Sequence, residues 1–307
     1  MISWKGASVL KSILASVDPE ETRVAILEDG ALQAVEMERS SHAHLVGNIY
    51  KGRVQNVLPG MQAAFVDIGS EKNAFLYIGD GKTHDPMRAG DRPARIHVGQ
   101  SLPVQITKDA YGTKGPRATT HITLPGRTVV LLPTAAYIAL SHRIEDEAER
   151  ERLHAIAERV CPEGMGLLVR TAAVHCAEEA IAADVRQLVR LWQVILARYE
   201  LARKGASLLY RDADLLIRIV RDSFSEEVDE LIVDDREAFS RVSELVAALS
   251  PDLLPRMRLH SARAPLFAAY GVEKEIEKLG AREVELKNGG FLVIDKTEAL
   301  TAIDVNT

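Results

Sequence analysis

The stretch from Gly47 to Asp80 constrains the fold of this chain more than any other part of the sequence. It contains three short runs of β-branched, aromatic and other apolar residues, namely Ile49–Val54, Ala63–Ile68 and Phe75–Ile78. Turn-forming residues separate the runs at positions 58–60 and 69–73. Short apolar runs between turn signals are typical of β-strands. The stretch therefore predicts a small β-barrel.

The same runs mix aromatic rings with positive charge. The residues concerned are Tyr50, Lys51, Arg53, Phe65, Lys72, Phe75 and Tyr77. A flat ring can stack on any base and a cation can meet any phosphate, so this mixture suits single-stranded nucleic acid. The alternative is that some of these rings simply fill the barrel interior, and composition alone does not decide between the two.

The remainder of the predicted barrel contains two loops. Residues 79–93 are rich in Gly, Asp and Pro and predict a surface loop. After a further predicted strand, Ser101–Thr107, the turn 108–115 carries Lys108 and Lys114. These two lysines flank the expected groove, so they are candidates for phosphate contact, although lysines in such turns are often only solvated charges.

Charge is unevenly distributed along the chain. The formal net charge of the 307 residues is -6, which argues against nucleic-acid binding over the whole surface. Residues 47–128, however, hold eleven Lys and Arg against six Asp and Glu. Release of counterions from nucleic acid would favour binding at this basic part of the chain.

The two cysteines, Cys161 and Cys176, form no CxxC pair. This pattern excludes a four-thiolate zinc site within the chain and a disulfide scaffold, and it favours a reducing compartment. The N-terminal residues lack the pattern of a signal peptide, and no apolar run is long enough to span a membrane. We therefore expect a cytoplasmic protein.

Outside the barrel, strands and helices alternate. The expected strands are 12–17, 23–27, 31–37, 129–132, 166–172, 215–220, 230–233, 257–260, 284–286, 291–294 and 300–305. Helices are expected at 146–160, from Ile181 to about Arg203, after the capping residue Asp235, and at 272–279. Trp192 lies on an apolar helical stripe and should be buried in the core. This alternation indicates a layered α/β unit.

Two further groups of residues could support chemistry. Asp304 and Asn306 are two residues apart on a predicted strand and so share one face. Their oxygens suit a hard cation such as Mg²⁺, although an Asp near a strand end is commonly a turn or cap residue. Arg170 and Thr171 end another strand and could grip a phosphate, although such a pair is commonplace.

The order of the motifs resembles one family. NIYKG, AAFVD and FL in the barrel, GLLVRT at 166–171 and TEALTAIDVN at 297–306 are similar to the RNase E/G endoribonucleases. The resemblance implies an α/β protein with a β-barrel and several domains. An S1-type OB-fold (40–125) would be inserted in a discontinuous RNase H-like domain (1–39 and 208–280). A small α+β 5′-sensor (126–207) and the start of a DNase I-like domain (281–307) complete the expected division.

The resemblance also implies roles for individual residues. Phe65 and Phe75 would stack on bases, with Lys114 on the nearby RNA backbone. A pocket for the 5′-monophosphate of RNA would be formed by Gly126, Val130, Arg170 and Thr171. Asp304 would bind Mg²⁺ as the first of two catalytic aspartates, and Asn306 would orient the cluster of metal and phosphate. Asp295 and Glu298 are expected to be turn residues.

The resemblance implies a Mg²⁺-dependent endonuclease for single-stranded RNA that responds to a 5′-monophosphate and leaves 5′-phosphate and 3′-hydroxyl ends. The sequence stops at the exit of a strand, so we expect that more chain follows, including the second aspartate and the CPxC zinc-link, which are not encoded here. The sequence does not decide whether the full-length protein forms a homo-oligomer. This chain alone should bind RNA better than it cuts it. The alternatives are a non-catalytic RNA-binding protein and an unrelated α/β protein.

Overall fold

The computed structural model describes residues 10–40, 44–78, 96–202, 205–286, 289–298 and 300–306. It divides the chain into two compact units. The first, called the split unit below, combines Met1–Ser41 with Leu215–Thr307. The second, the central unit, is His42–Asp214. The finer division of the chain into named domains stays a prediction.

A five-stranded mixed sheet forms the centre of the split unit, in the order β15-β14-β1-β2-β3. Its strands are β1 (Lys11–Val17), β2 (Glu21–Glu28), β3 (Ala31–Arg39), β14 (Glu230–Val233) and β15 (Met257–Leu259). β1, β2 and β3 are antiparallel, whereas β14 runs parallel to both β1 and β15. Asp29 and Gly30, both with positive φ, make the turn between β2 and β3.

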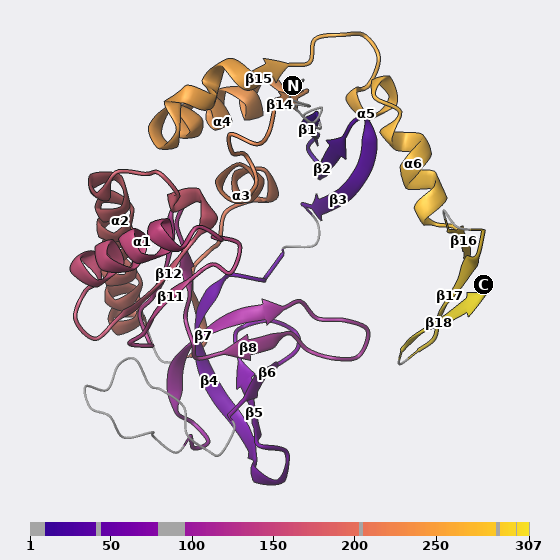
Figure 1. The fold of residues 1–307 in the computed structure, drawn as a ribbon. Helices are drawn as coiled ribbons and strands as arrows, with labels where there is room; N and C mark the ends of the chain where they lie inside the picture. Colours follow the sequence, from indigo (N-terminus) through magenta and orange to yellow (C-terminus); the bar gives the residue numbers. More distant parts are fainter. Residues whose placement is uncertain are drawn as a thin grey trace. The chain divides into compact units, whose positions relative to one another are not determined.

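Helices cover both faces of this sheet (Figure 1). The helices are α3 (Leu215–Asp222), α4 (Arg236–Leu249), α5 (Leu266–Ala269) and α6 (Val272–Leu279). Because side chains alternate along a strand, Ile13 packs in the cluster with α3 and α4, whereas Leu14 packs with α5 and α6. Asp235 caps α4 by accepting a hydrogen bond from the backbone of Ala238, as predicted. The predicted layered α/β unit is therefore confirmed.

The strand predicted at 215–220 is wrong, because this segment forms α3. Its buried residues share one helical face and are Leu215, Leu216, Ile219 and Val220. Arg218 lies between these positions and Arg221 follows them, and both are only half-buried. A short apolar run does not by itself distinguish a buried helix from a buried strand. The two arginines are three residues apart, which is the spacing of residues on one side of a helix.

A closed five-stranded barrel forms one part of the central unit and confirms the predicted barrel. Its strands are β4 (Ile49–Leu58), β5 (Ala63–Asp67), β6 (Ala74–Tyr77), β7 (Ser101–Lys108) and β8 (Arg117–Thr119). They follow the order β4-β5-β6-β8-β7, and pairing of β7 with β4 closes the barrel. Val54, Val66 and Val104 are among its buried residues. The loop predicted at 79–93 lies outside the described residues.

A four-stranded sheet forms the other part of the central unit, in the order β11-β12-β10-β9. Its strands are β9 (Leu124–Pro125), β10 (Val129–Leu132), β11 (Ile138–Leu140) and β12 (Gly166–Val169). The strand predicted to reach residue 172 ends at Val169 and continues as a 3-10 turn, Thr171–Ala173. Helices α1 (Glu147–Val160) and α2 (Glu178–Leu201) share a core with this sheet, in which Trp192 is buried as predicted.

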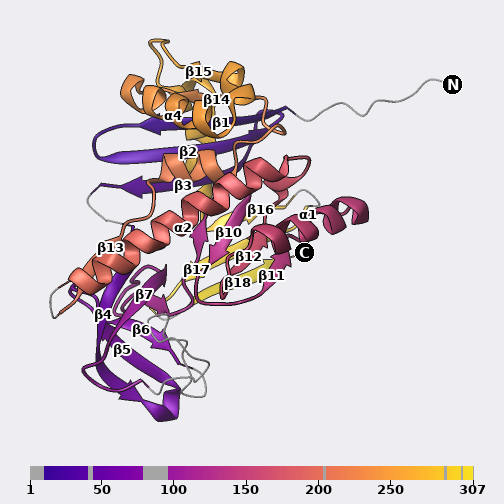
Figure 2. The ribbon, with the colours of Figure 1, turned by 90° about the vertical axis from the view of Figure 1, so that its left-hand side faces the viewer.

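The barrel and the four-stranded sheet are joined through the end of α2. Strand β13 (Ser207–Tyr210), which follows α2, pairs with β4 of the barrel (Figure 2). The ammonium group of Lys51 donates hydrogen bonds to the carbonyls of Tyr199 and Ala202, both at 2.9 Å. The Tyr199 hydroxyl in turn donates to the carbonyl of Ser101 on β7 at 2.9 Å. These contacts fix α2 to the barrel within one unit.

A three-stranded antiparallel sheet ends the described chain. Its strands are β16 (Glu283–Glu285), β17 (Phe291–Lys296) and β18 (Thr301–Asn306), with β17 in the middle. The expectation that Asp295 is a turn residue is wrong, because Asp295 belongs to β17 and the turn begins at Thr297. Within the part of the chain that the structure describes, no helix has the length and apolarity needed to cross a membrane.

Candidate functional site

The two phenylalanines predicted to contact RNA lie side by side on the outer face of the barrel. Phe65 on β5 is directly opposite Phe75 on β6, and their ring centroids are 6.0 Å apart at an interplanar angle of 75°. Both rings are half-buried, whereas their strand neighbours Ala64 and Leu76 are fully buried in the barrel core. The rings are therefore partly accessible to a ligand on the outside of the barrel.

Two cations extend this pair into a row across the sheet. Arg117 on β8 is opposite Phe75, and Lys108 on β7 is opposite Arg117. Residues that are paired across neighbouring strands project to the same face. Both cationic side chains are exposed. We call these four residues, Phe65, Phe75, Arg117 and Lys108, the barrel row.

The turn that carries Lys114 is tied to the barrel. Tyr111 and Lys114 exchange backbone hydrogen bonds across the turn. Lys72 donates to the carbonyl of Gly112 at 2.6 Å, and the carboxylate of Asp109 accepts from the backbone of Leu45 at 2.8 Å. Lys114 is exposed at the tip of this anchored turn, near the end of β7.

The sequence pattern did not identify Arg117 as a candidate for RNA binding, and it included Lys51, which has another role. Arg117 belongs to the barrel row only through strand pairing, which no local pattern reveals; the signal available was one more cation shortly after Lys114. The sequence places Lys51 among the cations that suit contact with phosphate. Its ammonium group instead binds the carbonyls at the end of α2 and lies 4.7 Å from the centre of the Tyr199 ring. That position makes Lys51 a structural residue.

The residues predicted to bind a 5′-phosphate lie where β9, β10 and β12 meet. The guanidinium of Arg170 donates to the carbonyl of Gly126 at 2.7 Å, and its backbone N–H donates to the carbonyl of Thr128 at 2.8 Å. Thr171 follows directly and is exposed. Val130 lies one step further along β10, opposite Leu168. The structure thus joins Arg170 directly to Gly126, with Thr171 next in the chain after Arg170 and Val130 on β10.

An acidic residue that the sequence did not single out holds the loop 126–129. One carboxylate oxygen of Asp184 on α2 accepts hydrogen bonds from the backbone and the hydroxyl of Thr128, at 2.7 and 2.8 Å, and from the backbone of Val129 at 3.3 Å. A Cβ atom on Gly126 would lie only 2.5 Å from the same carboxylate. A Cβ at 126 would force the Asp184 carboxylate or the loop to shift, so glycine is favourable at this position.

A second acidic residue holds the segment that follows Thr171. Glu149 on α1 forms a two-bond ion pair with Arg152, at 2.6 and 2.7 Å. Glu149 also accepts from the backbone of His175, which has a φ of 60°, and Arg152 donates to the carbonyl of Cys176. The hydrogen bond from Arg152 is the main cause that lowers the pKa of Glu149 to about 2, with burial opposing it. The pair ties α1 to the turn between β12 and α2.

Asp304 and Asn306 lie on the same face of β18, as predicted. Both are within the strand, and the amide of Asn306 donates to a carboxylate oxygen of Asp304 at 3.2 Å. Asp304 is exposed. A solvated carboxylate beside an amide has the donor chemistry that suits Mg²⁺, which keeps several waters and takes one or two protein carboxylates. Among the described residues, no group of three or more His, Cys, Asp or Glu is arranged to hold a metal.

The neighbouring acidic residue Asp295 is engaged elsewhere. Its carboxylate pairs with both ends of the Arg282 guanidinium, at 2.6 and 2.8 Å. The hydrogen bond from Arg282 lowers the pKa of Asp295. This ion pair engages both carboxylate oxygens of Asp295.

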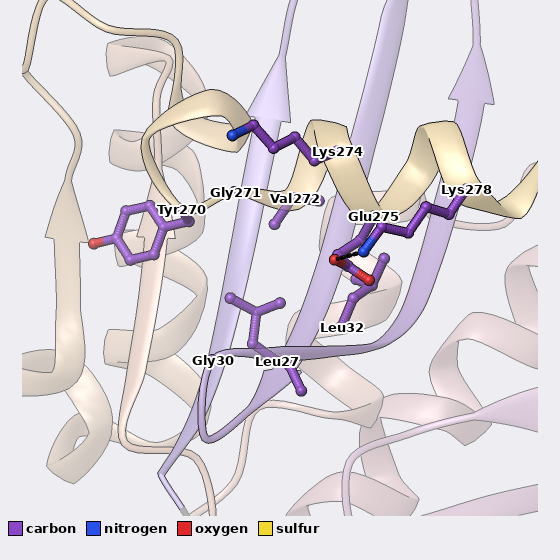
Figure 3. A pocket seen from close by; sticks show the side chains of 10 residues that line it. Leu27, Gly30, Leu32, Tyr270, Gly271, Val272, Lys274, Glu275 and Lys278 are labelled. Carbon is purple, nitrogen blue, oxygen red and sulfur yellow. Dashed lines mark hydrogen bonds and ion pairs between the residues drawn. The ribbon is translucent and has the colours of Figure 1, made fainter. Parts of the chain in front are cut away.

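The structure also contains a hollow that the predicted site residues do not line. It has a volume of about 440 Å³ and lies in the split unit, between the β2–β3 turn and α6. Figure 3 shows Leu27 and Leu32 below Val272, with Lys274, Glu275 and Lys278 along α6. Glu275 and Lys278 pair with each other at 2.7 Å. The predicted residues are therefore located on strand faces and in loops instead of in this hollow.

Comparison with known proteins gives consistent similarities. The sequence model of the Ribonuclease E/G family matches residues 123–307. Ribonuclease G of Salmonella typhimurium (strain SL1344) is 42% identical over 304 residues, which cover 96% of this chain and 62% of that protein. Ribonuclease G of Escherichia coli (strain K12) gives the same identity and coverage. Ribonuclease E of Nostoc sp. is 40% identical over 280 residues, which cover 90% of this chain and 41% of that protein. The chain thus spans less than two thirds of the length of these relatives.

Proposed function

Because this chain belongs to the ribonuclease E/G family, we propose that it takes part in Mg²⁺-dependent endonucleolytic cleavage of single-stranded RNA. In this proposal a 5′-monophosphate on the substrate stimulates cleavage, and the products carry 5′-phosphate and 3′-hydroxyl ends. The biological role would be RNA processing and decay, including that of rRNA, in bacterial cytoplasm. The observation that carries the proposal is the barrel row, with two accessible rings and two cations on one face.

The barrel row would hold the RNA strand. Bases stack on Phe65 and Phe75, while Arg117, Lys108 and Lys114 contact the phosphates on either side. Stacking of one base on an aromatic ring contributes about 1–3 kcal/mol and tolerates any base. The contact to the backbone is electrostatic, so binding should weaken as salt is added. This combination selects unpaired strands, because duplex bases have no free face to stack on a ring.

The loop 126–129 and the end of β12 would recognise the 5′ end. Arg170 offers a planar, charged donor group and Thr171 an exposed hydroxyl. Gly126 and Val130 would contribute their main chain. A small site built around one phosphate would accept a 5′-monophosphate and reject a triphosphate.

The β17–β18 hairpin would provide part of the catalytic centre. Asp304 would hold Mg²⁺, and Asn306 orients the Asp304 carboxylate through the hydrogen bond between their side chains. When bound, Mg²⁺ would activate a water molecule and stabilise the charge on the scissile phosphate. A metal centre of this kind needs further ligands besides Asp304, and we propose that the whole protein supplies them, together with a zinc-linked homo-oligomer.

We also propose the finer architecture that the family resemblance implies. The closed barrel would be an S1-type OB-fold, and the helix-covered sheet of the split unit an RNase H-like domain. The part of the central unit after the barrel would be the 5′-sensor, and β16–β18 would open a DNase I-like domain. What supports these assignments is the closed five-stranded barrel and the mixed sheet with helices on both faces.

The test is cleavage of an AU-rich single-stranded RNA with a 5′-monophosphate in the presence of Mg²⁺. We expect the full-length protein to cut it, the Asp304→Asn variant to lose cleavage while keeping RNA affinity, and this chain alone to bind more strongly than it cuts. Mapping the product ends would check for 5′-phosphate and 3′-hydroxyl groups. Cleavage that persists in Asp304→Asn would rule out the catalytic assignment.

A non-catalytic RNA-binding protein is the second candidate. It is favoured by the hairpin, because Asp295 is paired with Arg282 and, among the described residues, no group of three or more His, Cys, Asp or Glu is arranged to hold a metal. This candidate predicts RNA binding by the barrel row without cleavage by the full-length protein. The same experiment therefore separates the two functions.

A further inference from the structure

The loop 126–129 is held from two opposite sides. On one side, Asp184 accepts the two N–H groups of Thr128 and Val129 and the Thr128 hydroxyl. On the other side, Arg170 donates to the carbonyls of Gly126 and Thr128. Thr128 and Val129 are buried, at 5% and 0% exposure, so their polar groups depend on these partners instead of water. Asp184 therefore fixes the end of the loop that begins with Gly126, whose carbonyl accepts from the Arg170 guanidinium.

The carboxylate of Asp184 is unexpected next to a site that is proposed to bind phosphate. A negative charge close to a phosphate site repels the ligand and would by itself weaken binding. Asp184 would be favourable there only if its contribution to the shape of the loop exceeded that repulsion. Three donors converge on one of its oxygens, and Gly126 packs directly against the carboxylate, so the loop conformation is built around this side chain.

We propose that Asp184 is a positioning residue for recognition of the RNA 5′ end. It acts through the loop 126–129, which in turn orients the Arg170 guanidinium toward the phosphate. The inference deepens the proposed 5′-phosphate site and rests on it. Asp184 does not touch the RNA in this proposal.

The direction of the change in RNA binding distinguishes positioning of the loop from simple electrostatic repulsion of the phosphate. Asp184→Asn keeps the size of the side chain and one acceptor oxygen, but it removes the charge that strengthens all three hydrogen bonds to the loop. If Asp184 only repels phosphate, the variant should bind 5′-monophosphorylated RNA more tightly. If Asp184 positions the loop, the variant should lose preference for the 5′-monophosphate. The two explanations thus predict changes in opposite directions.

The measurement is the affinity of the full chain for one single-stranded oligoribonucleotide, labelled at its 3′ end, with either a 5′-monophosphate or a 5′-hydroxyl. EDTA is present so that no RNA is cut. We expect the ratio of the two affinities to fall roughly to one in Asp184→Asn, while the affinity for the 5′-hydroxyl RNA changes less than about twofold because the barrel row holds that RNA.

A matched control removes an acidic charge from the same helix. Glu179 is exposed in the first turn of α2, and Glu179→Gln should leave the ratio unchanged. Thr128→Val removes one of the three donors and should lower the ratio partly, whereas Thr128→Ser keeps the hydroxyl and should retain it. These two variants test the same contact if Asp184→Asn does not fold.

The outcomes are distinct. If the unmodified chain prefers the 5′-monophosphate and Asp184→Asn or Thr128→Val keeps or increases that preference, the role of Asp184 is refuted while the 5′-phosphate site stands. If the unmodified chain shows no preference, the 5′-phosphate site itself is refuted and the inference falls with it.

Discussion

Replacing Glu149 by Gln tests how the fold supports the proposed 5′-phosphate site. Glu149 is 7% exposed and has bonds to Arg152 and to the backbone of His175. Gln keeps the shape and part of the hydrogen bonding, but it removes the charge that the Arg152 guanidinium faces. The variant should therefore destabilise the central unit at neutral pH.

The pKa of Glu149 sets the size of this effect. It falls from 4.5 to about 2 in the folded protein. Because each pKa unit between the folded and unfolded states corresponds to about 1.4 kcal/mol, the ionised carboxylate adds at most about 3 kcal/mol to the free energy of unfolding. A depressed pKa contributes stability that is complete above pH 4.5 and is lost as the pH falls through about 2. At pH 3, about 2 kcal/mol of it should be gone.

The assay is urea unfolding of the unmodified chain and Glu149→Gln at pH 7, 4 and 3, followed by circular dichroism. The difference between the two proteins should be largest at pH 7 and shrink as the pH falls. Glu178 on α2 provides the control, because it pairs with Arg159 of α1 at the surface, where the two side chains are 41% and 56% exposed. Glu178→Gln should leave stability nearly unchanged. Equal effects of the two variants, or a difference that does not shrink at low pH, would refute the reasoning.

Three further predictions concern RNA binding. Phe75→Ala should weaken affinity for single-stranded RNA by about 1–3 kcal/mol in a titration, since it removes one stacking ring, whereas Phe75→Tyr should retain most of the affinity. Arg117→Gln should reduce the slope of log affinity against log salt by about one, in titrations at several salt concentrations, whereas Lys51→Gln should not, because Lys51 binds carbonyls of α2. Gly126→Ala should abolish the preference for a 5′-monophosphate, since its Cβ would lie 2.5 Å from the Asp184 carboxylate, and a retained preference would contradict the close approach.

The strands of the barrel could be predicted because each of them is indicated by a short segment of the sequence. Each strand between 49 and 78 is an apolar run bounded by turn residues, and the structure keeps these limits to within a few residues. The pairing of β7 with β4 that closes the barrel is not local. Closure was therefore expected from the number of strands and the family resemblance, and not from any run by itself.

The error at 215–220 has a physical cause. A short run with four buried apolar residues fits a β-strand that is buried on both faces of a sheet. It fits equally well an α-helix that is buried on one face. The segment packs as α3 in the cluster with β1, so only one helical face is buried. The choice between the two is made by packing against residues that lie some 200 positions earlier in the chain, which a short window cannot include.

The same limit applies to the candidate sites. The sequence could place Arg170 and Thr171 at a strand end, but it could not show that Asp184 holds the loop that Arg170 contacts. Asp184 is one polar position on a long amphipathic helix, with no local signal that separates it from its neighbours. Its partners Thr128 and Val129 are more than 50 residues away. Residues that position a site are thus harder to predict than residues that belong to a motif.

Lys51 shows the converse problem. It belongs to the motif NIYKG, and by composition it looked like one more cation for phosphate. In the structure its ammonium group satisfies carbonyls that the last turn of α2 leaves without helical partners, and it lies over the ring of Tyr199. A cation is favourable at the C-terminal end of a helix, where the helix dipole is negative. A residue can therefore be part of a recognisable RNA-binding motif because it joins the barrel to its neighbour, and membership of the motif does not by itself indicate contact with RNA.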